Sequence, residues 1–236
     1  MRRPPLHRRL LRVPRPSDKR LAVRVTPDAL RHIRSGHPWV FEESVTSISH
    51  EAEVGDISVI FDNDRKFVAL ALYDPDSPIQ FRILHVGKPT PIDADWWRST
   101  IGAALDVRAP FTTAPDADRL AYRVLNGEND GVSGHVVDRF AGVLVVKLYS
   151  AVWFPHLVPV DNALLDLTGC SSVVLRLARN LQTRETFRLA DGDVIAGDLP
   201  DGPVRFVEAG LEFDLSLIHI SEPTRLKTRS RMPSSA

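Results

Sequence analysis

The 236-residue chain has little sulfur and no long apolar run. A single cysteine, Cys170, excludes an internal disulfide framework and fits a reducing compartment, so we expect a cytoplasmic protein. No apolar run approaches the ~18 residues that can span a bilayer, and we expect no membrane partner. The N-terminus is charged and proline-rich without a sustained apolar segment, which argues against a signal peptide.

Several motifs that indicate a cofactor, phosphate or metal site are also missing. The chain has no G-x-G-x-x-G after a strand and no G-x-x-x-x-G-K-[ST], so it offers no dinucleotide fingerprint and no P-loop. None of the eight histidines has metal-ligand spacing with a cysteine or carboxylate, and we predict no metal site. Cys170 lies in a turn between Gly169 and two serines, where nothing secures a lowered thiol pKa, which predicts a bystander. No residue is therefore assigned as catalytic or cofactor-binding.

Charge is balanced overall but not along the chain. Residues 1–20 hold eight bases and one acid, and residues 215–236 hold four bases and one acid. Residues 21–214 consequently carry 18 bases and 28 acids. This acidic body argues against broad nucleic-acid binding and predicts no DNA partner, so any RNA contact must be a local patch or shape readout. Residues 1–20 are predicted to be a disordered basic extension.

The first half of the chain reads as a small, mostly β domain over 21–90. A strand begins at Leu21, and Thr26 as N-cap with Pro27 behind it predicts a short helix that stops at Gly36. Two alternating runs, 57–61 and 67–73, flank a turn-forming Asp-Asn-Asp and predict a β-hairpin. In HPWVF, Trp39 and Phe41 share one side of a strand and are more often core residues than base-stacking ones.

Residues 91–209 read as a central α/β domain, because strands and helices alternate there. Asp93 is the predicted N-cap of an amphipathic helix that reaches Arg108, and 143–148 is a buried strand. A proline-interrupted helix over about 154–167 ends near Gly169, and a strand follows at 173–177.

The segment 123–140, RVLNGENDGVSGHVVDRF, combines three glycines with Glu128, Asp130 and Asp138. It predicts a rigid, hydrogen-bonded loop, although a plain glycine-rich hairpin connection is the simpler reading. Glu128 with Asp130 is either an acid/base pair or a pair of loop-structuring carboxylates. One further cluster is either an RNA-phosphate patch or a solvated face. It consists of Arg176, Arg179, Arg184 and Arg188.

Three ordered segments carry a family resemblance: GHPWVF at 36–41, YDPDSPIQFRIL at 73–84 and the segment 123–140. Together they resemble bacterial class I S-adenosylmethionine (SAM)-dependent methyltransferases of large-subunit ribosomal RNA with an N-terminal PUA domain, associated with 5-methylcytosine. The resemblance implies an α+β chain with a PUA-like barrel, a central α/β domain and a Rossmann-like methyltransferase domain. It implies ribosomal RNA as partner, SAM as cofactor and a possible homodimer.

The resemblance also assigns two sets of residues by motif. The RNA-binding set in the PUA-like domain is Gly36, His37, Pro38, Trp39, Phe41 and Arg82. The substrate-cleft loop set is Arg123, Asn126, Glu128, Asp130 and Asp138.

The C-terminal end departs from the family pattern. GLEFDL at 210–215 resembles the strand that opens the methyltransferase domain, and 210–214 is predicted to be its start. No GQKTGFFLDQR-like segment follows, and LSLIHISEPTR at 215–225 resembles the translation of a sequencing-adapter sequence. The hypothesis is that the reading frame leaves the gene near Leu215. It predicts a disordered, non-native tail over 215–236, no Rossmann-like domain, no SAM bound to this chain and no activity.

Two alternatives remain at this point. The chain could be a stand-alone, non-catalytic RNA-binding module. It could also be a fragment that folds poorly because apolar surface is left uncovered.

Overall fold

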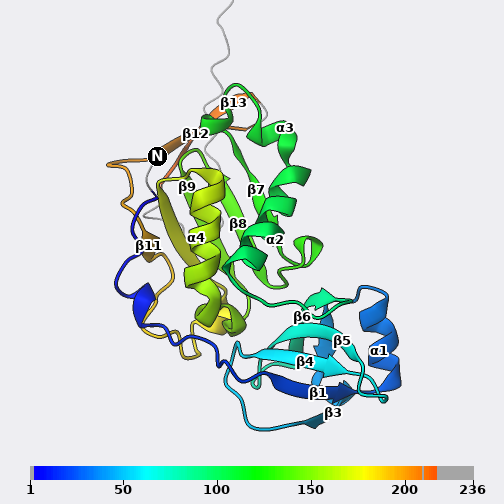
Figure 1. Cartoon of the computed structure of the whole chain (residues 1–236). Coiled ribbons are helices and arrows are strands. Elements are labelled where there is room, and N and C mark those ends of the chain that lie inside the picture. Colours follow the sequence, from blue (N-terminus) through cyan, green and yellow to red (C-terminus); the bar gives the residue numbers. More distant parts are fainter. Residues whose placement is uncertain (1–2, 209, 217–236) are drawn as a thin grey trace, which may run out of the picture.

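The computed structural model describes residues 3–208 and 210–216. The predicted tail beyond residue 216 lies outside the described residues. Figure 1 shows a smaller β-rich unit beside a larger unit in which two long helices cover a sheet. In the part of the chain that is described, no helix is both long and apolar enough to cross a membrane.

The first unit is a six-stranded sheet with one helix. Its strand order is β2-β6-β5-β4-β1-β3, so β2 and β3 are edges rather than neighbours in a closed barrel. Only β1 and β4 run parallel. The elements are β1 (Leu21–Val25), α1 (Pro27–Arg34), β2 (Trp39–Phe41), the 3-10 turn η2 (Glu42–Ser44), β3 (Val45–Ile48), β4 (Ile57–Phe61), β5 (Phe67–Tyr73) and β6 (Ile79–Val86).

Local capping chemistry explains the start and end of α1. The Thr26 hydroxyl accepts a hydrogen bond from the Ala29 amide, and Pro27 occupies the first helical position. Gly36, just past the helix, has φ +92°, which a side chain would oppose. The predicted helix is confirmed, and so is the predicted hairpin, since β4 and β5 pair antiparallel.

The second unit is built on a five-stranded sheet of order β11-β10-β9-β8-β7. Its helices are α2 (Ala94–Val107), α3 (Ala109–Thr112) and α4 (Leu157–Thr168), with 3-10 turns η3 (Ala117–Arg119), η4 (Gly127–Asp130), η5 (Ala151–His156) and η6 (Arg179–Leu181). Its strands are β7 (Ala121–Asn126), β8 (His135–Phe140), β9 (Val143–Leu148), β10 (Ser172–Leu177), β11 (Val194–Ala196), β12 (Val204–Glu208) and β13 (Leu211–Leu215).

Helices α2 and α4 lie over one face of this sheet (Figure 1) and bury a core that includes Trp97, Trp153 and Leu144. Strands β9 and β10 are parallel and are joined through η5 and α4, and the other pairs are antiparallel. The predicted helix after Asp93 and the predicted strand 143–148 are confirmed. The second helix starts later than predicted, at Leu157, because a 3-10 turn containing Pro155 precedes it.

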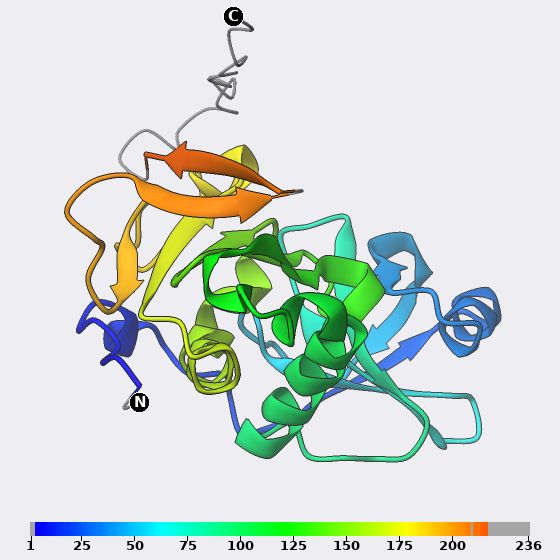
Figure 2. The ribbon, with the colours of Figure 1, turned by 90° about the horizontal axis from the view of Figure 1, so that it is seen from above.

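A hairpin of β12 and β13 packs on the other face of the sheet, as the view from above shows (Figure 2). The ring centroids of Phe206 and Phe140 are 5.2 Å apart, and Val204 packs with Val143 in a small apolar cluster. Residues 211–215 therefore pair with the strand before them, across the domain boundary that the sequence predicted at 209/210.

The N-terminal segment differs from the predicted disordered extension. Leu6 bridges to Ala196 at the sheet edge, η1 (Leu10–Arg12) follows, and Leu10 is completely buried. Composition averaged over residues 1–20 hid these few apolar side chains among the arginines, and they anchor the described segment against α4.

Candidate functional site

A row of aromatic side chains follows the edge strand β2. The His37 and Trp39 rings are 5.8 Å apart and nearly perpendicular, and Trp39 and Phe41 repeat this arrangement at 6.4 Å. His32 of α1 extends the row, 6.0 Å from His37. The three β2-segment rings are half-buried, so they are neither core residues nor freely exposed ones. Flat rings at this spacing can stack with bases.

Polar contacts around the Ser133 hydroxyl join this edge to the second unit. The Trp39 indole Nε1 donates to Ser133 Oγ at 2.7 Å, and the Ser133 hydroxyl donates to Glu128 Oε1 at 2.8 Å. The Arg82 guanidinium also donates to Ser133 Oγ, at 3.3 Å. The pKa of Arg82 is lowered, because the effect of burial outweighs the opposing effect of the negative charges of Asp74 and Glu128.

The structure thus brings together residues that the sequence placed in two separate sets. Trp39 and Arg82 came from the RNA-binding set and Glu128 from the cleft loop, and they meet at one hydroxyl. Ser133 itself was missed, because a lone serine beside a glycine carries no sequence signal for a junction.

A second link runs through Asp74, which is 1% exposed. Arg184 donates to both Asp74 carboxylate oxygens, at 2.8 and 3.2 Å, and the Ser150 hydroxyl donates to it at 3.1 Å. Arg184 also bonds Asp76 at 2.8 Å. This arginine, predicted within a possible phosphate patch, is therefore neutralised across the domain junction.

The predicted loop 123–140 is in fact mostly a hairpin of β7 and β8, closed by η4. Asp130 accepts two hydrogen bonds from Arg108, at 3.2 and 2.6 Å, and one from the Asn126 amide at 2.6 Å. Arg123 donates to both oxygens of Asp138, at 2.9 and 3.3 Å. Each carboxylate of the loop has its own partner, as loop-structuring groups do.

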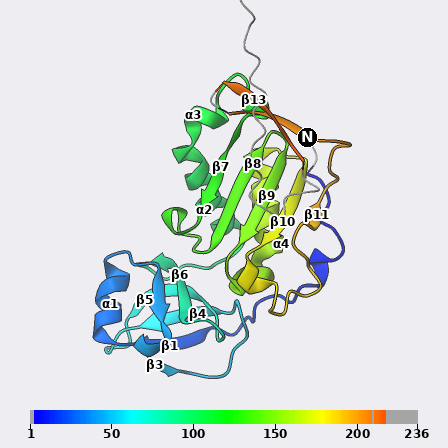
Figure 3. The same ribbon diagram turned by 180° about the vertical axis from the view of Figure 1, so that it is seen from behind.

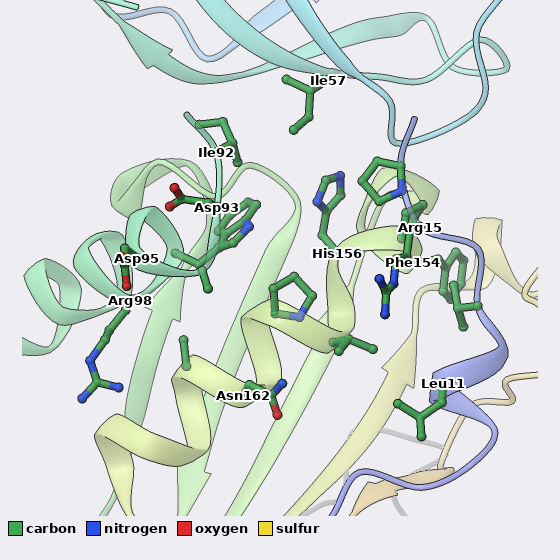
Figure 4. A pocket seen from close by; sticks show the side chains of 18 of the residues that line it. Leu11, Arg15, Ile57, Ile92, Asp93, Asp95, Arg98, Phe154, His156 and Asn162 are labelled. Carbon is green, nitrogen blue, oxygen red and sulfur yellow. The ribbon is translucent and has the colours of Figure 1, made fainter. Parts of the chain in front are cut away.

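A cavity of about 740 Å³ lies between the N-terminal segment, β4, α2 and α4 (Figure 4). Apolar side chains such as Ile57 and Phe154 line it, together with charged ones such as Arg15 and Asp95. Its size suits a small-molecule ligand, and none of the residues predicted as sites lines it. Because four distant segments form it, the sequence offered no signal for it.

The side chains that line the cavity do not form a recognisable SAM-binding site. Asp93 caps α2 by accepting from the Trp96 amide, and Asp166 is paired with Arg3 and Arg98. Dinucleotide-binding sites use a glycine-rich turn that leads from a strand into a helix. Among the described residues, no strand of the five-stranded sheet is followed by such a turn, since the glycines after β7 lie in a hairpin. No contact to a cofactor is therefore assigned to a particular side chain.

Several buried titratable side chains lie outside the contacts described above. Burial lowers the pKa of His135 to about 3 and that of His156 to about 4, and it raises the pKa of Asp161. Burial also raises the pKa of the Cys170 thiol, in line with a bystander role. Within residues 3–208 and 210–216, no group of three metal-ligating side chains occurs.

Comparison with known proteins bears on both units. The family model for a PUA-like domain matches residues 23–85, which lie in the six-stranded unit. The chain is 48% identical over 210 residues to a ribosomal RNA large subunit methyltransferase of Deinococcus radiodurans, covering 85% of this chain and 50% of that protein. It is 27% identical over 188 residues to a ribosomal RNA large subunit methyltransferase I of Pseudoalteromonas translucida, covering 80% and 47%. The chain thus spans about half the length of these relatives.

Two solved structures share the fold. A protein assigned as a SAM-dependent methyltransferase from Streptococcus mutans aligns with a TM-score of 0.64 at 11% identity, over 82% of this chain and 47% of that one. A methyltransferase structure solved with S-adenosylhomocysteine (SAH) aligns with a TM-score of 0.65 at the same identity and coverage.

These matches correct three predictions. The α+β assignment that excluded a methyltransferase fold is wrong, because 82% of the chain aligns with methyltransferase structures. The reading as a truncated chain without a catalytic domain, or as a non-catalytic RNA-binding module, is contradicted by the same structures and by the rRNA methyltransferase relative. The prediction that no cofactor binds is contradicted by the likeness to the SAH complex. All three rested on the C-terminal end, where one family segment is missing and residues 215–225 resemble an adapter translation, and so on a short stretch rather than on the fold of the whole chain.

Proposed function

We propose that the protein is a SAM-dependent methyltransferase of large-subunit ribosomal RNA, and that its PUA-like domain helps to hold the RNA. The observation that carries the proposal is the 48% identity over 210 residues to the ribosomal RNA large subunit methyltransferase of Deinococcus radiodurans. The match of the PUA-like family model to residues 23–85 supports the RNA-holding role.

Within the RNA-binding set, the proposal separates two roles. Trp39 and Arg82 direct polar atoms at Ser133, so they position the β2 edge against the second unit. The His37 and Phe41 rings have no such tie to the second unit among the described residues and are proposed to contact RNA, with Gly36 and Pro38 shaping the backbone that presents them.

The cleft-loop set is proposed to form one wall of the substrate cleft. Its members are Arg123, Asn126, Glu128, Asp130 and Asp138. The ion pairs Arg108–Asp130 and Arg123–Asp138 hold the hairpin in one shape, and a wall that positions a substrate needs such rigidity. These residues are proposed as positioning residues rather than catalytic ones.

SAM is the proposed methyl donor, and it would supply an electrophilic methyl group on its sulfonium. Carbon 5 of a cytosine is the proposed acceptor, on the resemblance of the three sequence segments. A cytoplasmic site of action follows from the ribosomal substrate, and a homodimer is proposed as the assembly. Sedimentation of the purified protein at several concentrations tests the last point.

The activity is tested by incubating the purified protein with methyl-tritiated SAM and deproteinised large-subunit rRNA from cells that lack the modification. The expected result is tritium in that RNA but not in small-subunit rRNA, and nucleoside analysis decides whether it resides in 5-methylcytidine. The Deinococcus radiodurans relative serves as the matched control. If the relative labels the RNA and this protein does not, the proposal is wrong.

A further inference from the structure

One face of the five-stranded sheet remains partly open. Figure 3 views the molecule from the side opposite to Figure 1, so this face is toward the viewer, with α2 and α4 behind the sheet and the β12–β13 hairpin across one end. The hairpin covers the rows near Phe140 and Val143. The rows toward the opposite end hold two exposed residues, Lys147 and Tyr149, of which Tyr149 is 44% exposed.

Strand register places a row of side chains across this open part. Asn126 is paired with Val136, Val136 with Lys147, and Lys147 with Arg176. Tyr149 lies just past the end of β9, and its contact with Lys147 places its ring beside this row. The Lys147 ammonium lies 5.0 Å from the centre of the Tyr149 ring, a cation–π distance.

The open part of the face carries a basic side chain, Lys147, outside the ion pairs of its neighbours. Asp138 neutralises Arg123, and Asp191 neutralises Arg176. No ion pair involves Lys147 within residues 3–208 and 210–216, and its ammonium lies over the Tyr149 ring. In a body whose acids outnumber its bases by ten, this is a local site that attracts a phosphate backbone.

A flat sheet with an exposed aromatic ring beside a cation is a platform for single-stranded RNA. A base stacks on the ring and the adjoining phosphate meets the cation, whereas the bases of a duplex are already stacked on one another. We propose that the open face of β7–β10 binds single-stranded RNA, with Tyr149 stacking a base and Lys147 contacting phosphate. This inference rests on the proposed function and adds a second RNA surface to it.

The two surfaces adjoin the same turn. In η4, Glu128 contacts the Trp39 indole of the β2 edge, and Asn126, immediately before the turn, starts the lysine row. An RNA strand that passes the β2 aromatic row is thereby brought to the open sheet face, so the two surfaces can act on one molecule.

The test is fluorescence anisotropy with the full chain and a fluorescein-labelled oligouridylate of about 12 nucleotides. Tyr149→Ala is expected to weaken binding about 5- to 150-fold, and Tyr149→Phe, which keeps the ring, should bind nearly as wild type. Lys147→Ala should lower the slope of log affinity against log salt by about 0.7. Phe111→Ala, at a 48% exposed aromatic position on α3, and Lys88→Ala are matched controls.

The outcomes separate the inference from the proposed function. Loss of binding in the Tyr149 and Lys147 variants but not in the controls supports the inference. Unchanged binding in these variants together with a loss in His37→Ala overturns it and leaves the PUA-like surface in place. No binding of the oligouridylate by the wild-type chain at low salt overturns the inference, whereas the proposed function is decided separately by the methylation assay with ribosomal RNA. A changed oligomeric state in Tyr149→Ala with unchanged RNA binding shows that the face meets protein, and it also overturns the inference.

Discussion

The indole of Trp39 donates a 2.7 Å hydrogen bond to the hydroxyl of Ser133, 94 positions further along the chain. The same hydroxyl accepts from Arg82 and donates to Glu128, so a single side chain satisfies groups from both units. The β2 edge is thereby held against the β7–β8 hairpin. Four pairs of variants test how the units are held together and how burial sets their stability.

Replacing Ser133 with alanine should destabilise the chain by about 1–3 kcal/mol, because the buried donors of Trp39 and Arg82 lose their shared acceptor. Urea denaturation measures the effect. Ser171→Ala is the control, since that exposed hydroxyl bonds only Gly142 within its own unit and should change stability by less than about 0.5 kcal/mol. Equal losses in the two variants would contradict the role given to Ser133.

Asp74 and Asp76 both bond Arg184 but differ in burial, at 1% and 72% exposure. Asp74→Asn should cost about 3–5 kcal/mol, because it leaves a largely buried guanidinium without its main counter-charge. Asp76→Asn should cost no more than about 1 kcal/mol, as exposed ion pairs do. Chemical denaturation of the two variants side by side decides the matter, and similar values for both would refute the assignment.

Gly55 of the first unit lies directly against Val152 and Pro155 of the second. Its φ is +87°, and an added Cβ would come within 2.7 Å of the Val152 carbonyl and 2.8 Å of the Pro155 ring. Gly55→Ala should therefore cost about 2–5 kcal/mol, from backbone strain and overpacking together. Gly36→Ala has a similar φ of +92° but open space, so it isolates the strain at about 1–2 kcal/mol. A thermal or urea series showing no excess for Gly55 would argue against a tight junction.

His135 and His156 should make the chain sensitive to acid. Burial lowers their pKa values to about 3 and about 4, whereas the unfolded chain binds protons near the ordinary value of 6.5. Between those values the unfolded state holds more protons, so the free energy of unfolding falls as pH falls, by about 1.4 kcal/mol per unit for each histidine. Above about pH 6.5 both states are neutral at these rings and the effect vanishes.

The variant His135→Phe removes one of these two contributions. Its stability, measured by urea denaturation from neutral pH down to about pH 4, should fall less steeply than that of the wild type. His32→Gln, at an exposed position of α1, controls for loss of an imidazole and should keep the wild-type slope. An unchanged slope in His135→Phe would show that this ring is not buried in its neutral form.

Local features were predictable from sequence, and long-range ones were not. Thr26, Pro27 and Gly36 act within one helix, and the hairpin partners lie next to each other in the chain, so their chemistry is readable from neighbours. The Trp39–Ser133 contact and the cavity depend on segments that meet only after folding. Ser133 therefore had to be found in three dimensions.

Two errors have a common physical origin. The N-terminal segment was judged by its arginines, although two of its side chains, Leu10 and Val13, are buried in the hydrophobic core. The methyltransferase fold was excluded because no GQKTGFFLDQR-like segment follows residue 215 and the residues there resemble an adapter translation, although folds are set by core packing over many residues. In both cases a conspicuous local pattern outweighed a distributed one.

The central claim, that the protein methylates large-subunit ribosomal RNA, is tested most directly by nucleoside mass spectrometry of that RNA from cells with and without the gene. The account predicts that one methylated nucleoside, 5-methylcytidine, falls in the large-subunit RNA of the deletion strain and returns when the gene is restored. Small-subunit RNA should be unchanged. Identical nucleoside profiles in the two strains would contradict the account.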